Sequence, residues 1–201
     1  VVFTATGEAG AWWIFGGDEE KAEKEETKQE TTKTEEKEQV NNKTLTIQGS
    51  STVLPIAQKA AEAFMEQNPE VNITVRGGGS GNGVAALIDG ATDIADASRF
   101  MKDKEIKQAV SNGIQPVPHR VAKDGIAVVV NPNNSVDGLT LDQIKKIYTG
   151  EITNWKQIGG PNKEIVVVSR DSSSGTFEVF GDIALDGEKV KPGALTQSSN
   201  G

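Results

Sequence analysis

From Thr44 onward, short apolar runs alternate with amphipathic stretches along the chain. Runs rich in Val and Ile that end at Gly, Asn or Pro predict short buried strands, and apolar residues spaced three or four apart predict helices. The predicted strands span residues 45–47, 71–75, 93–95, 125–130 and 165–168, and the predicted helices span 55–67, 84–88, 103–112 and 140–148. Because strands and helices alternate, the pattern predicts an α/β fold with mostly parallel sheets.

The first 17 residues are small and apolar, and they include the pair Trp12-Trp13. The stretch is too short to span a bilayer comfortably and carries Glu8, but adjacent tryptophans favour a membrane interface. We interpret residues 1–17 as the remnant of a signal peptide or of a membrane anchor. A plain N-terminal tail, or an artefact of the gene boundary, is the alternative.

Residues 18–43 contain ten acidic residues and six lysines and almost no apolar residues. Such a segment cannot form a core, so we predict a disordered charged linker. A linker after an apolar leader fits a domain that is tethered to the outer face of a membrane. Of the formal net charge of −8, residues 44–201 carry only −3, which argues against a nucleic-acid partner.

The chain has no cysteine and one histidine, His119. The lack of cysteine excludes disulfides and thiolate metal sites. His119 lies between Pro118 and Arg120 in a predicted loop, so it is a poor candidate for a catalytic base. The aspartates show no paired spacing of the kind that binds a metal, and we therefore expect neither a metal nor a cofactor.

Four predicted strand-to-helix junctions carry Ser, Thr and Gly in place of larger side chains. In a parallel sheet these junctions share the C-terminal edge, where helix N-termini offer free N–H groups and a positive dipole. Hydroxyls, amides and a guanidinium together suit a small oxyanion. The four junctions are Ser50-Ser51-Thr52, Gly79-Ser80-Gly81, Ala97-Ser98-Arg99 and Ser174-Gly175-Thr176.

The densest group of such residues lies at 169–177, which holds Arg170 and three consecutive serines. Taken alone, this stretch is equally typical of a Ser-rich turn that caps a helix. A P-loop is not present. Gly78 and Gly83 have the spacing of that motif, but Val84 stands where it needs lysine.

Five motifs follow one another along the chain: Gly49-Ser50-Ser51-Thr52-Val53-Leu54-Pro55, Gly79-Ser80-Gly81-x-Gly83, Asp93-Ile94-x-x-Ala97-Ser98-Arg99, Ile147-Tyr148-x-Gly150-x-Ile152-x-x-Trp155 and Arg170-Asp171-Ser172-Ser173-Ser174-Gly175-Thr176. Their order and spacing resemble the substrate-binding proteins of high-affinity phosphate ABC importers. The resemblance covers about residues 45–201 and implies a type II periplasmic-binding-protein fold, in which two α/β lobes joined by a hinge close on phosphate. We expect the first lobe at 44–127 and the second at 128–201. The family has a further C-terminal portion, so we expect both lobes to be incomplete and their closure to be weaker.

The resemblance also implies which residues bind phosphate. Donors from the first lobe would face donors at the start of a second-lobe helix, and Arg170 would form an ion pair with the anion. Ser98 stands where enteric-type members carry an aspartate that accepts the phosphate proton and excludes sulfate. A serine hydroxyl accepts as well as donates, with Asp96 and Asp171 as alternative acceptors. The implied phosphate-binding residues are Thr52, Val53, Ser80, Ser98, Arg170, Ser174, Gly175 and Thr176.

The function expected from this resemblance is extracytoplasmic binding of inorganic phosphate and its delivery to an ABC permease, by a monomer that performs no catalysis. Binding of another tetrahedral oxyanion, such as sulfate, molybdate or tungstate, is the alternative. A phosphatase that uses the serines is a third hypothesis. It is disfavoured because the sequence shows no P-loop, no paired base and no metal cluster.

Overall fold

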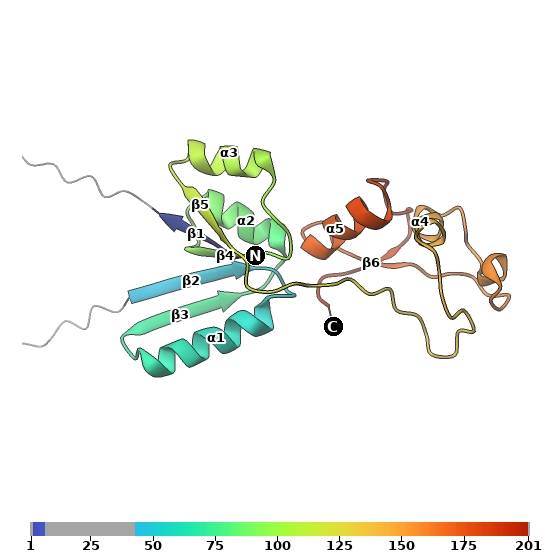
Figure 1. Cartoon of the computed structure of the whole chain (residues 1–201), viewed down its shortest axis with the longest axis horizontal. Coiled ribbons are helices and arrows are strands. Elements are labelled where there is room, and N and C mark those ends of the chain that lie inside the picture. Colours follow the sequence, from blue (N-terminus) through green and yellow to red (C-terminus); the bar gives the residue numbers. More distant parts are fainter. Residues whose placement is uncertain (1, 7–42, 201) are drawn as a thin grey trace, which may run out of the picture.

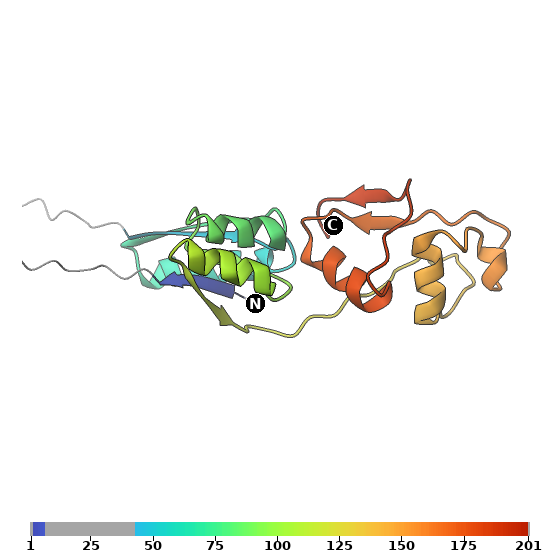
Figure 2. The same cartoon turned by 90° about the horizontal axis from the view of Figure 1, so that it is seen from above.

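The computed structural model describes residues 2–6 and 43–200, which form two lobes side by side (Figure 1). An extended stretch between residues 120 and 140 runs from the first lobe to the second, as both views show (Figure 2). Each lobe has its own small hydrophobic core. The described helices include none that is long and apolar enough to cross a membrane.

The first lobe is built on a five-stranded sheet in the order β3-β2-β4-β1-β5. Strand β2 pairs in parallel with β3 and β4, as expected for alternating strands and helices. Strand β1 is antiparallel to both of its neighbours, β4 and β5. The strands are β1 (Val2–Thr6), β2 (Lys43–Gly49), β3 (Val71–Arg76), β4 (Ile94–Asp96) and β5 (Gln115–His119).

Three helices complete this lobe: α1 (Leu54–Gln67), α2 (Ser80–Ile88) and α3 (Asp103–Ser111). Their positions match the predicted helices closely, and α2 begins four residues earlier than its apolar spacing indicated. Gly83 explains how α2 lies so close to the sheet, because a Cβ there would lie 2.4 Å from the carbonyl oxygen of Gln48. The buried core of the lobe comprises Val84, Leu87, Ile88, Ala95, Ala97, Met101 and Ala109.

Strand β1 changes the interpretation of the N-terminus. We expected residues 1–17 to be a leader or an anchor, but the structure places Val2–Thr6 inside the first-lobe sheet, paired with Ile94–Asp96 on one side and Gln115–His119 on the other. A strand with hydrogen-bonded neighbours on both sides is part of the sheet, and the interpretation of residues 1–17 as a leader or anchor stays a prediction. The remainder of 1–17, and most of the expected linker at 18–43, lie outside the described residues.

The second lobe has a two-stranded parallel sheet, the helices α4 and α5, and a 3₁₀ turn, η1. Helix α4 begins at a reciprocal cap between Thr140 and Gln143, at the start of the helix predicted over 140–148. The buried residues Ile147, Ile165 and Val167 form the core of the second lobe. The elements are α4 (Leu141–Thr149), η1 (Trp155–Ile158), β6 (Val168–Arg170), α5 (Gly175–Ala184) and β7 (Leu195–Gln197).

Two predicted strands differ from the structure. Residues 125–130 were expected to form a strongly buried strand, but they are extended without strand pairing, and the side chain of Val129 is 86% exposed. A strand needs a neighbour that completes its hydrogen bonds, and no described strand lies beside this run. The strand expected at 165–168 begins at Val168 instead, although Ile165 and Val167 are buried as the pattern predicted.

Candidate functional site

The predicted junctions meet where the lobes face each other. Ser80 opens α2 and is fully buried, and its Oγ accepts a hydrogen bond from the amide of Ser98 at 3.0 Å. The two hydroxyl oxygens are 3.1 Å apart. Gly175 of α5 lies directly against them, because a Cβ on Gly175 would lie 2.4 Å from Ser98 Oγ and 2.5 Å from Ser80 Oγ. The N-terminus of a second-lobe helix therefore contacts two first-lobe junctions.

Helix α5 begins as the sequence indicated. Ser174 is its N-cap, is 2% exposed, and accepts a hydrogen bond from the amide of Phe177 at 3.3 Å. The next amides, those of Gly175 and Thr176, belong to the first turn, where backbone N–H groups have no intrahelical acceptor. This stretch therefore fits both interpretations that its sequence allowed, a capping turn and an oxyanion-binding junction. Ser174 caps the helix, and the helix N-terminus points at the first lobe.

The first junction is folded around Ser50. Its Oγ accepts hydrogen bonds from the amides of Thr52 at 3.2 Å and Val53 at 3.3 Å. The amide of Val53, one of the predicted anion donors, is thus engaged within its own turn. Thr52 does reach across the interface, because its Oγ1 accepts from Nδ2 of Asn200 at 2.7 Å.

Arg170 lies between the lobes, and its side chain is 12% exposed. One Nη donates to Ser51 Oγ of the first lobe at 3.0 Å and to the carbonyl of Ser198 at 3.1 Å. The other Nη donates to the side-chain oxygen of Asn200. Nε donates to the carbonyl of Gln197 at 3.0 Å. The guanidinium therefore joins the first junction, the end of β7 and Asn200.

Arg99, the other arginine in a predicted junction, does not face these groups. Its guanidinium forms two hydrogen bonds of 2.9 Å with the carboxylate of Glu105 and one of 2.8 Å with the carbonyl of Phe100. It also forms an ion pair with Glu178 of α5. Of the two junction arginines, only Arg170 has its guanidinium among the predicted donors.

The two alternative acceptors lie in different environments. Asp171 accepts hydrogen bonds from the amide of Ser173 at 3.0 Å and from its hydroxyl. Burial pulls the pKa of Asp171 upward, but the hydrogen bonds from Ser173 and the charge of Arg170 outweigh it and lower the pKa. The carboxyl group of Asp171 is therefore ionised and already accepts hydrogen bonds from Ser173.

Asp96 is 2% exposed, and within the described part of the chain its Oδ2 has no hydrogen-bond partner. Burial raises the pKa of Asp96 to about 6. Its backbone carbonyl accepts from the amide of Ser50 at 2.9 Å, which ties β4 to the first junction. Asp96 thus supports the first junction through its backbone.

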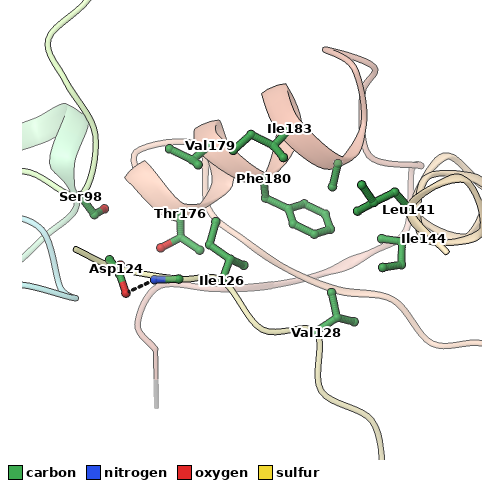
Figure 3. Close-up of a pocket in the computed structure, with 12 residues that line it drawn as sticks. Ser98, Asp124, Ile126, Val128, Leu141, Ile144, Thr176, Val179, Phe180 and Ile183 are labelled. Atoms are coloured by element: carbon green, nitrogen blue, oxygen red, sulfur yellow. Dashed lines mark hydrogen bonds between the residues drawn. The ribbon is translucent and has the colours of Figure 1, made fainter. Parts of the chain in front are cut away.

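A cavity of about 420 Å³ begins beside Ser98 and Thr176 and continues between α5 and the extended segment that joins the lobes (Figure 3). Ser98, Asp124 and Thr176 supply the polar groups at one end, and the side chains farther along are apolar. The apolar lining includes Ile126, Val128, Leu141, Ile144, Val179, Phe180 and Ile183. A small anion at the polar end would lie next to the N-terminus of α5.

A family model described as "PBP superfamily domain" matches residues 23–200. The chain belongs to the PBP superfamily. Phosphate-binding protein PstS of Bacillus subtilis is 43% identical over 156 residues, which cover 78% of this chain and 51% of that protein. PstS of Staphylococcus saprophyticus is 39% identical, over 71% of this chain and 46% of that protein. The chain thus spans about half the length of the curated relatives it matches.

Solved structures give the same family. A putative phosphate ABC transporter substrate-binding protein from Clostridium perfringens, with bound phosphate, superposes with a TM-score of 0.69 at 41% identity, covering 78% of this chain and 62% of that one. An ABC-type phosphate transport receptor from Vibrio cholerae superposes with a TM-score of 0.59 at 37% identity, covering 78% and 63%. The likeness confirms the predicted type II fold and the resemblance on which it rests.

Among the interface residues of this PBP-superfamily chain that were not predicted as site residues are Ser51, Ser173 and Asn200. Ser173 accepts at its carbonyl from the amide of Gly81 at 2.9 Å, and its hydroxyl, which donates to Asp171, lies 3.2 Å from the carbonyl oxygen of Gly78. Ser51 and Ser173 lie inside motifs that the sequence singled out, so their hydroxyl character was the available signal. Nothing in the sequence pattern around Asn200 indicated its contacts with Arg170 and Thr52.

Proposed function

We propose that this chain binds inorganic phosphate between its two lobes and serves as the extracytoplasmic substrate-binding component of a phosphate ABC importer. The observation that carries the proposal is the approach of the α5 N-terminus and Arg170 to Ser51, Ser80 and Ser98 of the first lobe. The names of the similar proteins support phosphate as the ligand.

The donor set suits a compact anion with several oxygens. The first turn of α5 supplies amides and the positive end of a helix dipole, and Arg170 supplies a fixed cation. Thr52, Ser80 and Ser98 supply hydroxyls that can each accept a hydrogen bond as well as donate one. For phosphate to reach Arg170 and Thr52, it must replace Asn200, whose carboxamide joins them in this structure.

The arrangement supports binding over catalysis. A serine nucleophile needs a base within hydrogen-bond reach, but Ser80 and Ser98 contact each other, and Ser174 caps its helix. His119, the single histidine of the sequence, lies exposed at the end of β5 in the first lobe. The similar proteins are named for binding and transport, which fits a non-enzymatic function.

Selectivity for phosphate over sulfate, molybdate or tungstate would depend on an acceptor for the phosphate proton. Ser98 is our first candidate, because Asp171 holds Ser173 and the Asp96 side chain is buried. We propose further that the lobes divide between residues 127 and 128, and that the protein acts as a monomer beside its permease.

The direct test is calorimetric titration of the 201-residue chain with phosphate, with sulfate as a competitor at one pH below and one above neutrality. We expect phosphate to bind and sulfate not to displace it at either pH. Arg170→Ala should raise the Kd for phosphate roughly 30- to 150-fold, because a charge-assisted contact worth about 2–3 kcal/mol is lost.

Arg120→Ala is the matched control, since Arg120 is an exposed first-lobe arginine whose guanidinium lies over the ring of Phe100, and it should bind as the wild type does. Equal affinities for phosphate and sulfate would favour the alternative of a general oxyanion-binding protein. An Arg170→Ala variant with wild-type affinity would remove Arg170 from the site.

A further inference from the structure

A second polar contact joins the lobes beside the candidate site. The carboxylate of Glu178, in the first turn of α5, lies 3.0 Å from Nε of Arg99 and 2.6 Å from Nζ of Lys102. Both cations belong to the first lobe, so one second-lobe carboxylate forms ion pairs with two first-lobe side chains. The Glu178 side chain is 18% exposed and that of Arg99 is 6% exposed, so water screens this contact less than a surface ion pair.

The Arg99 guanidinium in this cluster is held in place without Glu178. Glu105 accepts two hydrogen bonds from the Arg99 guanidinium and one of 2.8 Å from the backbone amide of Lys102. Glu105 neutralises only one of the two cations. Among these three first-lobe side chains, one positive charge remains uncompensated until Glu178 approaches. A preformed partner of this kind loses little side-chain entropy when it binds a carboxylate.

The position of Glu178 links this ion pair to the site. Glu178 follows Gly175 by three residues, so the contact holds the same helix turn whose N-terminus lies against Ser80 and Ser98. We propose that Glu178 is a positioning residue that latches the closed arrangement of the two lobes through Arg99 and Lys102. Its carboxylate pairs with Arg99 and Lys102, which lie outside the proposed phosphate shell, and it would raise affinity by increasing the population of the closed state.

The part of this proposal that concerns affinity rests on the proposed function, whereas the part that concerns closure does not. A ligand that binds only the closed state has its apparent Kd divided by the fraction of molecules that are closed. Loss of the latch should therefore weaken phosphate binding and widen the distribution of interlobe distances. High salt should likewise weaken phosphate binding by the wild type and widen its distribution of interlobe distances, because salt screens the ion pair.

The experiment uses Glu178→Gln in the full 201-residue chain, with Glu188→Gln as the matched control. Glu188 also pairs with a lysine, Lys145 at 2.8 Å, but both residues lie in the second lobe. Because the chain has no cysteine, Lys59→Cys and Lys156→Cys place one spin label on an exposed position of each lobe. Distances between the labels are measured by pulsed electron resonance, and phosphate affinity is measured on the unlabelled proteins.

We expect Glu178→Gln to broaden and lengthen the interlobe distance and to raise the Kd for phosphate about tenfold, while Glu188→Gln changes neither. If Glu178→Gln does not fold, Lys102→Gln removes the more exposed partner and should give a smaller shift of the same sign. If the interlobe distances of Glu178→Gln match those of Glu188→Gln, Glu178 does not latch the lobes. Absence of phosphate binding by the wild type would overturn the proposed function, and the distances would still decide the latch.

Discussion

At the scale of single residues, Gly175 decides how closely the lobes approach. A methyl group on its Cα would lie within 2.5 Å of both Ser80 Oγ and Ser98 Oγ, closer than any real carbon–oxygen contact. The hydroxyls cannot both move away, because Ser80 is fully buried and also accepts from the Ser98 amide. The absence of a side chain at residue 175 is therefore a condition of the closed interface.

We predict that Gly175→Ala weakens phosphate binding roughly five- to 150-fold, because relieving such overpacking costs about 1–3 kcal/mol. Gly181 of the same helix provides the control, since a Cβ there meets nothing within 4 Å. Gly181→Ala should leave affinity unchanged and stabilise α5 by up to about 1 kcal/mol. Titration calorimetry and thermal unfolding of the two variants measure both effects, and equal affinities would contradict the role given to Gly175.

Asp96 should make stability depend on pH. Burial raises its pKa from 3.8 to about 6, so the folded state holds a proton that the unfolded state releases. The contribution of Asp96 to stability is therefore complete below pH 3.8 and is lost as the pH rises through about 6. Above that range the buried carboxylate is a net cost.

We expect Asp96→Asn to be more stable than the wild type at neutral pH, by up to about 3 kcal/mol, with the difference vanishing in acid. Urea unfolding at a series of pH values measures this difference. Asp89→Asn, at an exposed position of the same lobe, is the control variant. A flat difference for Asp96→Asn would show that its carboxyl is not buried in solution.

At the scale of elements, β1 completes the first-lobe sheet. Strand β5 pairs with β1 and with no other described strand, so β1 is its only link to β4. Thr4 lies at the centre, opposite Ile94 on one side and Val117 on the other. A proline there removes a ladder donor from an interior strand.

Thr4→Pro should lower the free energy of unfolding by about 2 kcal/mol or more, whereas Thr4→Ser, which keeps the N–H group, should cost much less. Urea denaturation gives both values. If both variants have the wild-type stability, residues 2–6 do not pair in the sheet, and the leader or anchor interpretation of 1–17 would stand.

The elements that the sequence predicted correctly are those specified by local chemistry. Apolar spacing and Pro55 place α1, and the cap at Thr140 places α4. The run at 125–130 has the composition of a buried strand, but strand formation depends on a partner that local sequence does not supply. Likewise, β1 lies 37 residues before β2 and pairs with β4 and β5, so only tertiary structure reveals it.

In the candidate site, too, local sequence specifies some residues and tertiary structure specifies the others. Ser174 and Gly175 could be predicted because a helix N-terminus after a strand creates free amides wherever it occurs. Asn200 and the Glu178 contact could not, because both depend on how the lobes meet, and side chains far apart in sequence form them. Arg99 illustrates the limit of motif reasoning, since its neighbours turn its guanidinium away from the other junctions.

At the scale of the whole molecule, two separate cores meet through a polar interface. The first-lobe and second-lobe cores share no residue, and the interlobe contacts described above are hydroxyls, amides and ion pairs. Such an interface is weak compared with an apolar one and favours relative motion of the lobes. A ligand that replaces part of these contacts can therefore control closure.

The most direct test of the central claim is amide hydrogen exchange of the 201-residue chain with and without phosphate, read residue by residue. The account predicts that phosphate slows exchange in both lobes together, at the first junction, at Ser80 and Ser98, and at residues 174–176. Protection confined to one lobe, or protection by sulfate equal to that by phosphate, would contradict a phosphate site shared between the lobes.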